Sequence, residues 1–449
     1  MRKSGHRRRK QTNEDSSFCD LCVTFASAAS VGPFFTPYTR PFMADPQVPR
    51  TTWLMLLALC TAFMLSQAYR TVAAMMATQL QGEFDLSLQQ LGVFAGAFHL
   101  AFGAMQLFMG VGIDLHGVRR TVLIAFPLAI AGSIVSALAP GYGLLLLGQV
   151  LVGIGCAPAF LVCTVFIARR FPEHRFAAVS GLAMGVGGLG LLLTGTPLAW
   201  LVHVHSWRAG FAVLALGSAL AWLAIFVWVR ETPPHAHAVN RESALQALRR
   251  FGALFGQPHT LGIVALGAVT YASFITLRGL WLGPLLIERY GFSLVQSGNV
   301  ALAVSLVGLF GPPVFGRLDP KQPARRRHWI VTLTLLMAGL FVLLAFAPSA
   351  LVCVAASIAV GFLCGFIVLQ YADVRAAYPQ ALTGRAMAVF TMAMFLGIAL
   401  MQWITGVVAS AAKAHQVEPF IAVLLTVSVL LAAGATAFAG LPAAPGPKA

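Results

Sequence analysis

The stretch GVGIDLHGVRRTVL, residues 110–123, separates two long apolar segments with a short charged turn. It contains Asp114 and the adjacent pair Arg119 and Arg120, whereas the segments on either side are mostly apolar. A helix needs about 20 mostly apolar residues to cross the hydrocarbon core of a bilayer. We therefore interpret the stretch as a turn at a membrane surface that joins two membrane-spanning helices.

The composition extends this interpretation to the whole chain. Of the 449 residues, 58% are hydrophobic and only 10% are charged, whereas a soluble protein has about 25% charged residues. So few charges cannot cover a water-facing surface, and most of the surface must face lipid. Twelve segments are long and apolar enough to span a bilayer: 53–79, 88–110, 120–139, 142–169, 176–203, 209–229, 260–287, 294–315, 328–347, 350–374, 385–411 and 419–440. The sequence predicts an all-α integral membrane protein with twelve transmembrane helices.

The positive charges predict the orientation in the membrane. With the N-terminus placed in the cytoplasm, 25 of the 30 Lys and Arg residues fall in cytoplasmic segments, and the loops after the first, third and ninth helices carry none. Cytoplasmic loops are enriched in Lys and Arg. We therefore expect cytoplasmic N- and C-termini in the cell inner (plasma) membrane. Because the charges lie between apolar runs and form no folded basic patch, we expect no nucleic-acid partner.

The chain repeats itself at an offset of 206 residues. The segment FDLSLQQLG at 84–92 aligns with YGFSLVQSG at 290–298. Two six-helix halves related in this way place a binding site between them, near the bilayer midplane. We expect two pseudo-symmetric six-helix bundles, 51–229 and 259–440, joined by a cytoplasmic linker, 230–258.

The two ends of the chain differ from the rest. Residues 1–50 are basic and lack an apolar run long enough for a signal peptide, so we predict a disordered tail. Met43 begins a short lead into the first helix, and we expect the natural start there. The alternative is a basic tail that touches anionic lipid. Residues 441–449 are predicted to form a cytoplasmic tail.

The charged turn also carries a family signature. It resembles the loop signature of the major facilitator superfamily (MFS), G-x-x-x-D-x-x-G-x-[RK]-[RK], at Gly110, Asp114, Gly117, Arg119 and Arg120. A weaker second copy contains Gly316 and Asp319. The resemblance covers about residues 50–440 and implies that these seven residues act in gating. In the family, the aspartate holds the cytoplasmic gate against the start of helix 11, where a helix N-terminus favours a carboxylate.

Two arginines lie where a membrane protein rarely has charge. Arg70 and Arg278 fall deep inside the first and seventh helices, at nearly equivalent positions in the two halves. Charged residues inside a bilayer are costly and usually functional. Only Asp373 is an acidic candidate within a span, so we expect a net positive cavity in which the arginines face each other. The alternative for each arginine is a structural contact to backbone carbonyls or to Asp373.

A planar guanidinium group suits phosphate and carboxylate, and the sequence therefore predicts an anionic solute. The segment Tyr69-Arg70 and the residues 277–284 are similar to the organophosphate:phosphate antiporters, whose paired arginines grip phosphate. Anion:cation symporters also place basic residues in this region, so organic acids and carboxylate sugars stay open as substrates.

Further polar side chains inside the predicted spans are candidates for the same binding site. His99 could titrate near neutral pH and carry a coupling proton, or it could be a hydrogen-bonded core histidine. The other candidates could orient a polar solute or form helix–helix hydrogen bonds: Gln149, Tyr271, Trp281, Gln370 and Gln402.

No catalytic, nucleotide-binding or metal-ligating motif occurs in the sequence, so we expect no enzyme activity, no cofactor and no metal. We predict a monomeric secondary transporter that moves a small organic anion, a carboxylate or a phosphorylated metabolite, by alternating access. Its partners would be the solute, the lipid bilayer, and a coupling proton or counter-anion. The alternatives are a drug/proton efflux antiporter, and a membrane sensor that keeps the MFS fold without transport.

Overall fold

A computed structural model describes residues 48–230, 254, 256–320, 322–378 and 380–442, and no β-strand occurs among them. Residues from Arg50 onward form one compact unit. Most of the predicted tails and of the linker 230–258, with Met43, lies outside the described residues, so the domain boundaries and the start at Met43 stay predictions.

Twelve helical segments of the described chain are long and apolar enough to cross a membrane, which confirms the predicted fold class. We number them spans 1 to 12. The first half contains α2 (Arg50–Tyr69), α3 (Val72–Phe84), α4 (Leu88–Ala137), α5 (Tyr142–Cys156), α6 (Ala159–Arg170), α7 (Glu173–Leu193), α8 (Thr196–Val204) and α9 (Trp207–Trp228). The second half contains α11 (Pro258–Thr276), η1 (Leu277–Trp281), α12 (Leu282–Pro284), η2 (Leu285–Arg289), α13 (Leu294–Gly308), α14 (Gly311–Arg317), α15 (Pro323–Ala345), α16 (Ala350–Leu363), η3 (Cys364–Phe366), α17 (Ile367–Ala377), α18 (Gln380–Ala414) and α19 (Pro419–Gly440).

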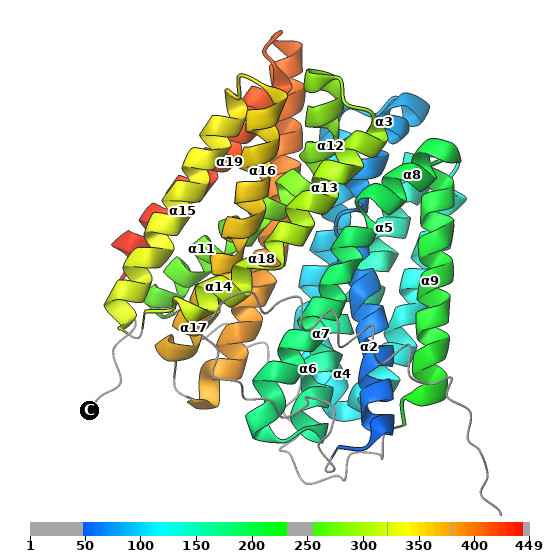
Figure 1. Ribbon diagram of the computed structural model, residues 1–449, viewed down its shortest axis with the longest axis vertical. Coiled ribbons are helices and arrows are strands. Elements are labelled where there is room, and N and C mark those ends of the chain that lie inside the picture. The colour runs from blue at the N-terminus through cyan, green and yellow to red at the C-terminus, as the bar shows by residue number, and fades with distance from the viewer. Residues whose placement is uncertain (1–47, 231–253, 255, 321, 379, 443–449) are drawn as a thin grey trace, which may run out of the picture. The chain divides into compact units, whose positions relative to one another are not determined.

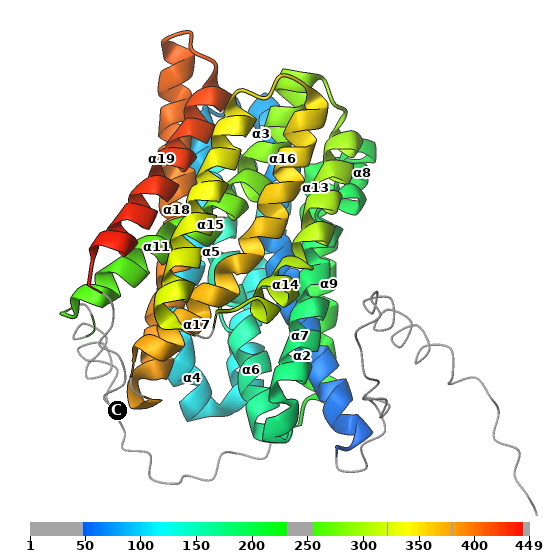
Figure 2. The same cartoon turned by 60° about the vertical axis from the view of Figure 1, so that its left-hand side comes forward.

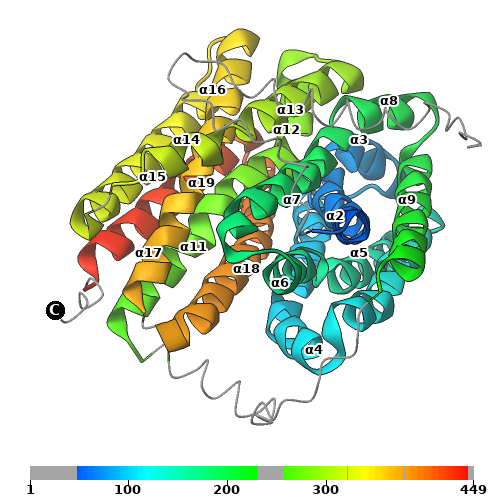
Figure 3. The same cartoon turned by 60° about the horizontal axis from the view of Figure 1, so that its bottom comes forward.

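The helices of each half gather on one side of the compact unit, as the colours in Figure 1 show. The same grouping is visible from one end of the helices in Figure 3. Several spans consist of more than one helix, because the chain breaks near their middle. Span 1 combines α2 with α3, span 5 combines α7 with α8, and span 7 contains two π-helical turns, η1 and η2. Irregular backbone at membrane depth is tolerated where it is buried in protein or lines a cavity.

The sequence repeat corresponds to repeated local structure. Ser87 and Ser293 begin α4 and α13, and each hydroxyl accepts a hydrogen bond from the backbone N–H three residues on, at 3.1 Å. In return, the side-chain oxygens of Gln90 and Gln296 accept a hydrogen bond from the backbone N–H of each serine, at 2.9 and 2.8 Å. Both serines therefore form capping boxes, which satisfy free N–H groups at a helix start.

The charged turn between spans 2 and 3 is very tight. The helix α4 carries both span 2 and span 3, and the only non-helical residue inside it is Gly117, with φ 80° and ψ 171°. This conformation is essentially restricted to glycine. A single glycine therefore reverses the chain direction between the two spans, inside the short turn that the sequence predicted.

Close packing inside each half also repeats. In span 5, a Cβ atom added to Gly190 would overlap the carbonyl oxygen of Met64 in span 1. In the second half, a Cβ atom added to Gly397 of span 11 would overlap the carbonyl oxygen of Ala268 in span 7. Small residues drive helix association in lipid because they let the backbones approach closely. In both halves, the equivalent helix pair thus contains a glycine packed against a backbone carbonyl of the neighbouring span.

The two ends of the helices differ in charge. We call the end with the Arg119 turn the basic end; it also carries Arg169, Arg170, Arg317, Arg325 and Arg326. We call the other end, where spans 1 and 2 meet at Asp85, the distal end. In Figure 2 the basic end lies at the bottom, near the start of α2, and the distal end at the top.

An ion pair fastens the distal end of each half. In the first half Glu83 pairs with Arg208 at 2.6 Å, and Arg208 also donates to the carbonyl of Ala139 at 3.2 Å. In the second half Arg289 pairs with Glu418 at 3.1 Å and donates to the carbonyl of Ala345 at 3.0 Å. The two ties join equivalent helix ends, but the acidic and basic partners are exchanged.

The two halves contact each other from the distal end to about the middle of the spans. Near the distal end, the N–H of Gln89 donates to Ser410 at 2.8 Å and Thr196 donates to Asn299 at 2.7 Å. Toward the middle of the spans, Gly103 packs against Phe395 and Gly188 packs against Leu309. The halves are therefore closed at the distal end.

Candidate functional site

Arg70 lies at the break between α2 and α3, in the middle of span 1. Its side chain is only 6% exposed, and its guanidinium carbon lies 4.9 Å from the centre of the Phe102 ring and 4.7 Å from that of Phe395. Both distances suit cation–π attraction. The Nε atom is buried and has no hydrogen-bond partner. Arg70 is therefore held by two aromatic faces, one from each half, while a strong donor stays unused.

A hydrogen bond joins the helix breaks of spans 1 and 5. Thr71 follows Arg70 in the break of span 1, and its hydroxyl lies 2.6 Å from the hydroxyl of Thr194 in the break of span 5. Thr194 also donates to the carbonyl of Leu191, at 3.1 Å. The irregular backbone around Arg70 is thus fixed from inside its own half.

Arg278 lies in the π-helical turn η1 of span 7 and is fully buried. Its Nε donates to the carbonyl of Ala301 and to the hydroxyl of Ser305, both at 3.0 Å. Its Nη2 donates across the two halves to the carbonyl of Leu191 at 3.0 Å, and its Nη1 is buried without a partner. Arg278 thus contacts backbone carbonyls, which is the structural alternative stated above.

Among the described residues, the two arginines contact different partners. Arg70 packs toward spans 2 and 11 through Phe102 and Phe395, whereas Arg278 bonds to spans 5 and 8. Where the chain is described, neither of them forms an ion pair; the ion pairs there lie at the helix ends. Asp373, the acidic residue expected in span 10, lines a small pocket with Gln370 and lies near Arg326 and Arg327 of the basic end.

His99 belongs to the surroundings of Arg70. Its ring stacks against Phe395, with centroids 6.5 Å apart, and its Nδ1 donates to the carbonyl of Ala95 at 3.1 Å. Its Nε2 is buried without a partner. Gln402, on the same helix as Phe395, is fully buried, and neither its Nε2 nor its Oε1 has a partner. Buried polar atoms are nearly always paired, so these free atoms mark a place where a polar ligand or water can bind.

The other candidate residues lie at varying distances from this cluster. Tyr271 belongs to the cluster, because it lies beside Arg70 and reaches Phe395 edge-on, with ring centroids 6.3 Å apart. Gln149 is buried with a free Nε2, and Gln370 accepts a bond from Thr270 at 3.0 Å while its own Nε2 is free. Trp281 donates to Thr405 at 3.0 Å and so fastens span 7 to span 11.

The predicted gating residues form contacts within each half. Arg119 donates to the carbonyl of Phe226 at 2.9 Å, in the last turn of α9, where a helix end favours a cation. Asp319 forms a two-pronged pair with Arg326 at 2.6 and 2.8 Å. Arg120 lies exposed at the turn, and Gly316 has open space around it. The surroundings of Gly110 and Asp114 lie outside what the structure describes, so the contact of Asp114 with helix 11 stays a prediction.

Sequence reasoning missed Phe102 and Phe395, the two rings around Arg70. A signal for Phe102 existed, because it lies three residues after His99 and therefore on the same helix face. Phe395 lies among many apolar residues of span 11, and no sequence signal distinguishes it. No group of three His, Cys, Asp or Glu residues that could hold a metal occurs in the part of the chain that the structure describes.

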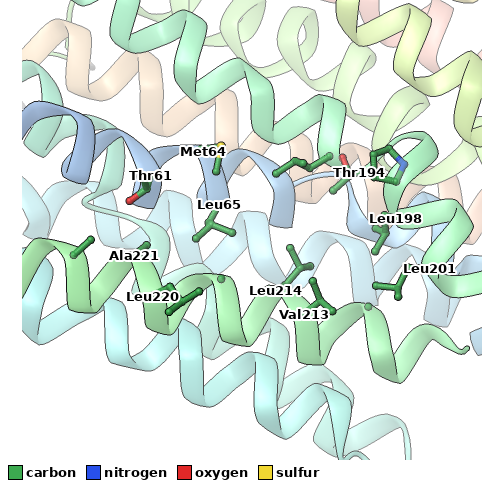
Figure 4. Close-up of a pocket in the computed structure, with 15 residues that line it drawn as sticks. Thr61, Met64, Leu65, Thr194, Leu198, Leu201, Val213, Leu214, Leu220 and Ala221 are labelled. Carbon is green, nitrogen blue, oxygen red and sulfur yellow. The ribbon is translucent and has the colours of Figure 1, made fainter. Parts of the chain in front are cut away.

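A separate apolar groove lies in the first half, between α2, α8 and α9 (Figure 4), with a volume of about 480 Å³. Leu198, Leu214 and Leu220 point into it. Its two hydroxyls, of Thr61 and Thr194, already donate to carbonyls of their own chain segments. The groove offers no free polar atom to a charged solute, and we therefore place the candidate site at Arg70.

Comparison with known proteins agrees with this architecture. The family model described as "Major Facilitator Superfamily" matches residues 54–402. The hexuronate transporter of Bacillus subtilis (strain 168) is 23% identical over 262 residues, 57% of this chain and 61% of that protein. The probable sulfoacetate transporter of Cupriavidus necator is 22% identical, covering 61% of this chain and 66% of that protein. The matches thus span less than two thirds of these two relatives.

Another relative is an MFS-type efflux pump of Mycolicibacterium smegmatis, 28% identical over 69% of this chain and 73% of that protein. Among solved structures, the D-xylose–proton symporter superposes with a TM-score of 0.71 at 17% identity, over 88% of this chain and 99% of that one. At such identity the likeness concerns the fold alone.

Proposed function

The chain belongs to the major facilitator superfamily, a family of membrane transporters of small solutes, and we propose that its own solute is a small organic anion. The fold and the family are those of transporters rather than enzymes. We further propose alternating access, in which the two halves expose a central site first to one side of the membrane and then to the other.

The observation that carries the proposal is Arg70. It is a buried cation with an unused donor and with no ion-pair partner in the part of the chain that the structure describes. An anionic group supplied by the solute would satisfy that donor with a charge-assisted hydrogen bond. Two relatives are named for hexuronate and sulfoacetate, which carry a carboxylate and a sulfonate. We propose a carboxylate, sulfonate or phosphate group as the ligand of Arg70.

The arginines of the basic end support an orientation. Because cytoplasmic loops are enriched in Lys and Arg, we propose that the basic end faces the cytoplasm and that the protein lies in the inner membrane. The halves are closed at the distal end, so we propose that the solute reaches Arg70 from the cytoplasmic side. Binding of an anion would neutralise Arg70 and allow the halves to close over the solute.

His99 is our candidate for the coupling proton. A backbone carbonyl accepts the proton on Nδ1, so the lone pair of Nε2 is left free in the neutral ring. The same cluster contains Arg70, which repels a second positive charge until an anion is bound. We therefore propose that the solute and a proton bind together, to a monomeric protein; a counter-anion in exchange is the alternative.

The test is uptake of radiolabelled glucuronate and sulfoacetate into proteoliposomes. Arg70→Gln removes the charge, and a lost charge-assisted hydrogen bond is worth about 1.5–3 kcal/mol, or about 10–150-fold in affinity. Arg70→Lys keeps the charge but loses the planar fork, so it should also transport poorly. Arg289→Gln is the matched control, because Arg289 is bonded only within the second half among the described residues. Uptake by Arg70→Gln at the wild-type rate would remove the anion site.

Drug efflux is the second candidate function, because one relative is an MFS-type efflux pump. A cationic drug needs a carboxylate in the cavity, whereas Asp373 lies toward the arginines of the basic end. Expulsion of a cationic dye from the same proteoliposomes, without uptake of either anion, would favour efflux. Binding of an anion without any flux would favour a sensor.

A further inference from the structure

We propose that Arg278 is a positioning residue that holds the distal end closed, and not a ligand of the solute. Arg278 donates three hydrogen bonds: Nε donates to Ala301 and Ser305 of span 8, and Nη2 donates to Leu191 of span 5. The first two partners belong to the half that carries Arg278. The bond to Leu191 is the one that crosses to the other half.

The position of Leu191 explains why its carbonyl can accept the bond from Arg278 beside the one from the Thr194 hydroxyl. The helix α7 ends at Leu193, because the chain breaks at Thr194 and Gly195. The last four carbonyls of a helix lack partners within it, and a cation is favoured there by the helix dipole. The break in span 5 thus creates an acceptor, and the π-helical turn in span 7 carries a guanidinium group that reaches it.

The site of this bond makes it dependent on conformation. Around it, backbone atoms of Arg70 lie against Gly279, and Gly195 lies against Leu302, so both halves are tightly packed at this level. The fully buried guanidinium cannot exchange its protein acceptors for water while the halves stay closed. Opening the distal end separates spans 5 and 7, and it must break the bond to Leu191, whereas the bonds to Ala301 and Ser305 can persist.

This inference rests on the proposed alternating access, but its test needs no solute. Spin labels are attached at His203→Cys and Lys413→Cys, two exposed positions at the distal ends of spans 5 and 11. The distance between the labels, measured by double electron–electron resonance, reports the separation of the halves. Cys19 and Cys22 are replaced by Ser so that only the introduced cysteines carry a label. The five described cysteines are buried, resist labelling and are left in place. The labelled full-length protein is measured in lipid nanodiscs without added substrate.

Arg278→Gln should raise the ratio of distal-open to distal-closed protein by about 10–150-fold, the weight of a hydrogen bond made by a charged group. The bond from Arg278 to Ser305 can persist in both conformations, so Ser305→Ala acts only by leaving the guanidinium less firmly aimed at Leu191. It should therefore raise the same ratio, but by less than the about fivefold that a whole neutral hydrogen bond is worth. This milder variant keeps the test decisive if Arg278→Gln does not fold. Arg289→Gln, the arginine that is bonded only within its own half among the described residues, should leave the ratio unchanged.

The proposal is overturned if Ser305→Ala and folded Arg278→Gln both keep the wild-type distance distribution, or if Arg289→Gln shifts it equally. Binding of glucuronate by calorimetry supplies a second readout: Arg278→Gln should bind as the wild type does, and Arg70→Gln should not. Loss of glucuronate binding in Arg278→Gln would make it a solute ligand instead. If the wild type binds no anion while the distances still shift, the distal lock stands and the anion proposal fails.

Discussion

Substitution of Gly190 by alanine should loosen the first half. The added Cβ atom would overlap the carbonyl oxygen of Met64, and a backbone atom cannot swing aside as a flexible side chain does. Spans 1 and 5 must therefore separate, and a gap of about 0.5–1 Å already forfeits a quarter to a half of each dispersion contact along the seam. Overpacking of this kind costs about 1–3 kcal/mol.

The expected loss can be measured as an apparent unfolding temperature of the purified protein. A domain of 150–250 residues loses about 2–4 °C per kcal/mol, so Gly190→Ala should melt about 2–12 °C below the wild type. Gly181→Ala, on the same helix, is the matched control, because its Cβ position is empty. There alanine should leave the melting temperature unchanged or raise it slightly, since alanine is the better helix former. If both variants melt together, the close approach of spans 1 and 5 is not what holds this half.

Three further predictions concern the helix ends. Ser87→Ala and Ser293→Ala should each lower stability by about 1 kcal/mol in thermal unfolding, and clearly unequal losses would contradict their equivalence. Gly117→Ala should cost about 1–3 kcal/mol because of its φ of 80°, and a normal melting temperature would contradict the turn. Glu83 has a pKa below its ordinary 4.5, chiefly because Arg208 donates to it; the pair therefore stabilises the folded state at neutral pH and loses this effect as the pH falls through the lowered pKa. At pH 7, Glu83→Gln should lower the free energy of unfolding by about 0.2–1 kcal/mol and therefore melt below the wild type. Well below pH 4.5 the two proteins should melt together, and equal melting at pH 7 would contradict the tie.

Much of the fold could be predicted because lipid imposes simple rules on sequence. Length and apolarity were enough to place the spans, since the bilayer requires about 20 apolar residues in each. The repeat also had predictive value, because Ser87 and Ser293 form the same capping box in both halves. The break after Tyr69 and the π-helical turn at Arg278 were not predicted, because apolar periodicity does not register a missing hydrogen bond inside a long apolar helix.

These local irregularities are also why the candidate site was only partly predicted. The sequence placed Arg70 and Arg278 at matching heights, but the direction of each side chain depends on the helix geometry beneath it. At Arg70 the helix of span 1 breaks, and the side chain packs on Phe102 and Phe395. At Arg278 the helix of span 7 widens into a π-helical turn, and the side chain reaches the carbonyl of Leu191 at the end of α7. Equivalent positions therefore carry equal charge without sharing an environment.

The ties at the distal end show that a mechanical link can be repeated without repeating its chemistry. Glu83 with Arg208 and Arg289 with Glu418 fasten the same helix ends, yet a comparison of the halves residue by residue would count two mismatches there. The ion pair recurs in both halves, whereas the helix end that carries the acidic partner differs between them. A search for internal duplication in such chains would therefore gain from scoring opposite-charge pairs jointly, because reversal of both partners preserves the link that either change alone would destroy.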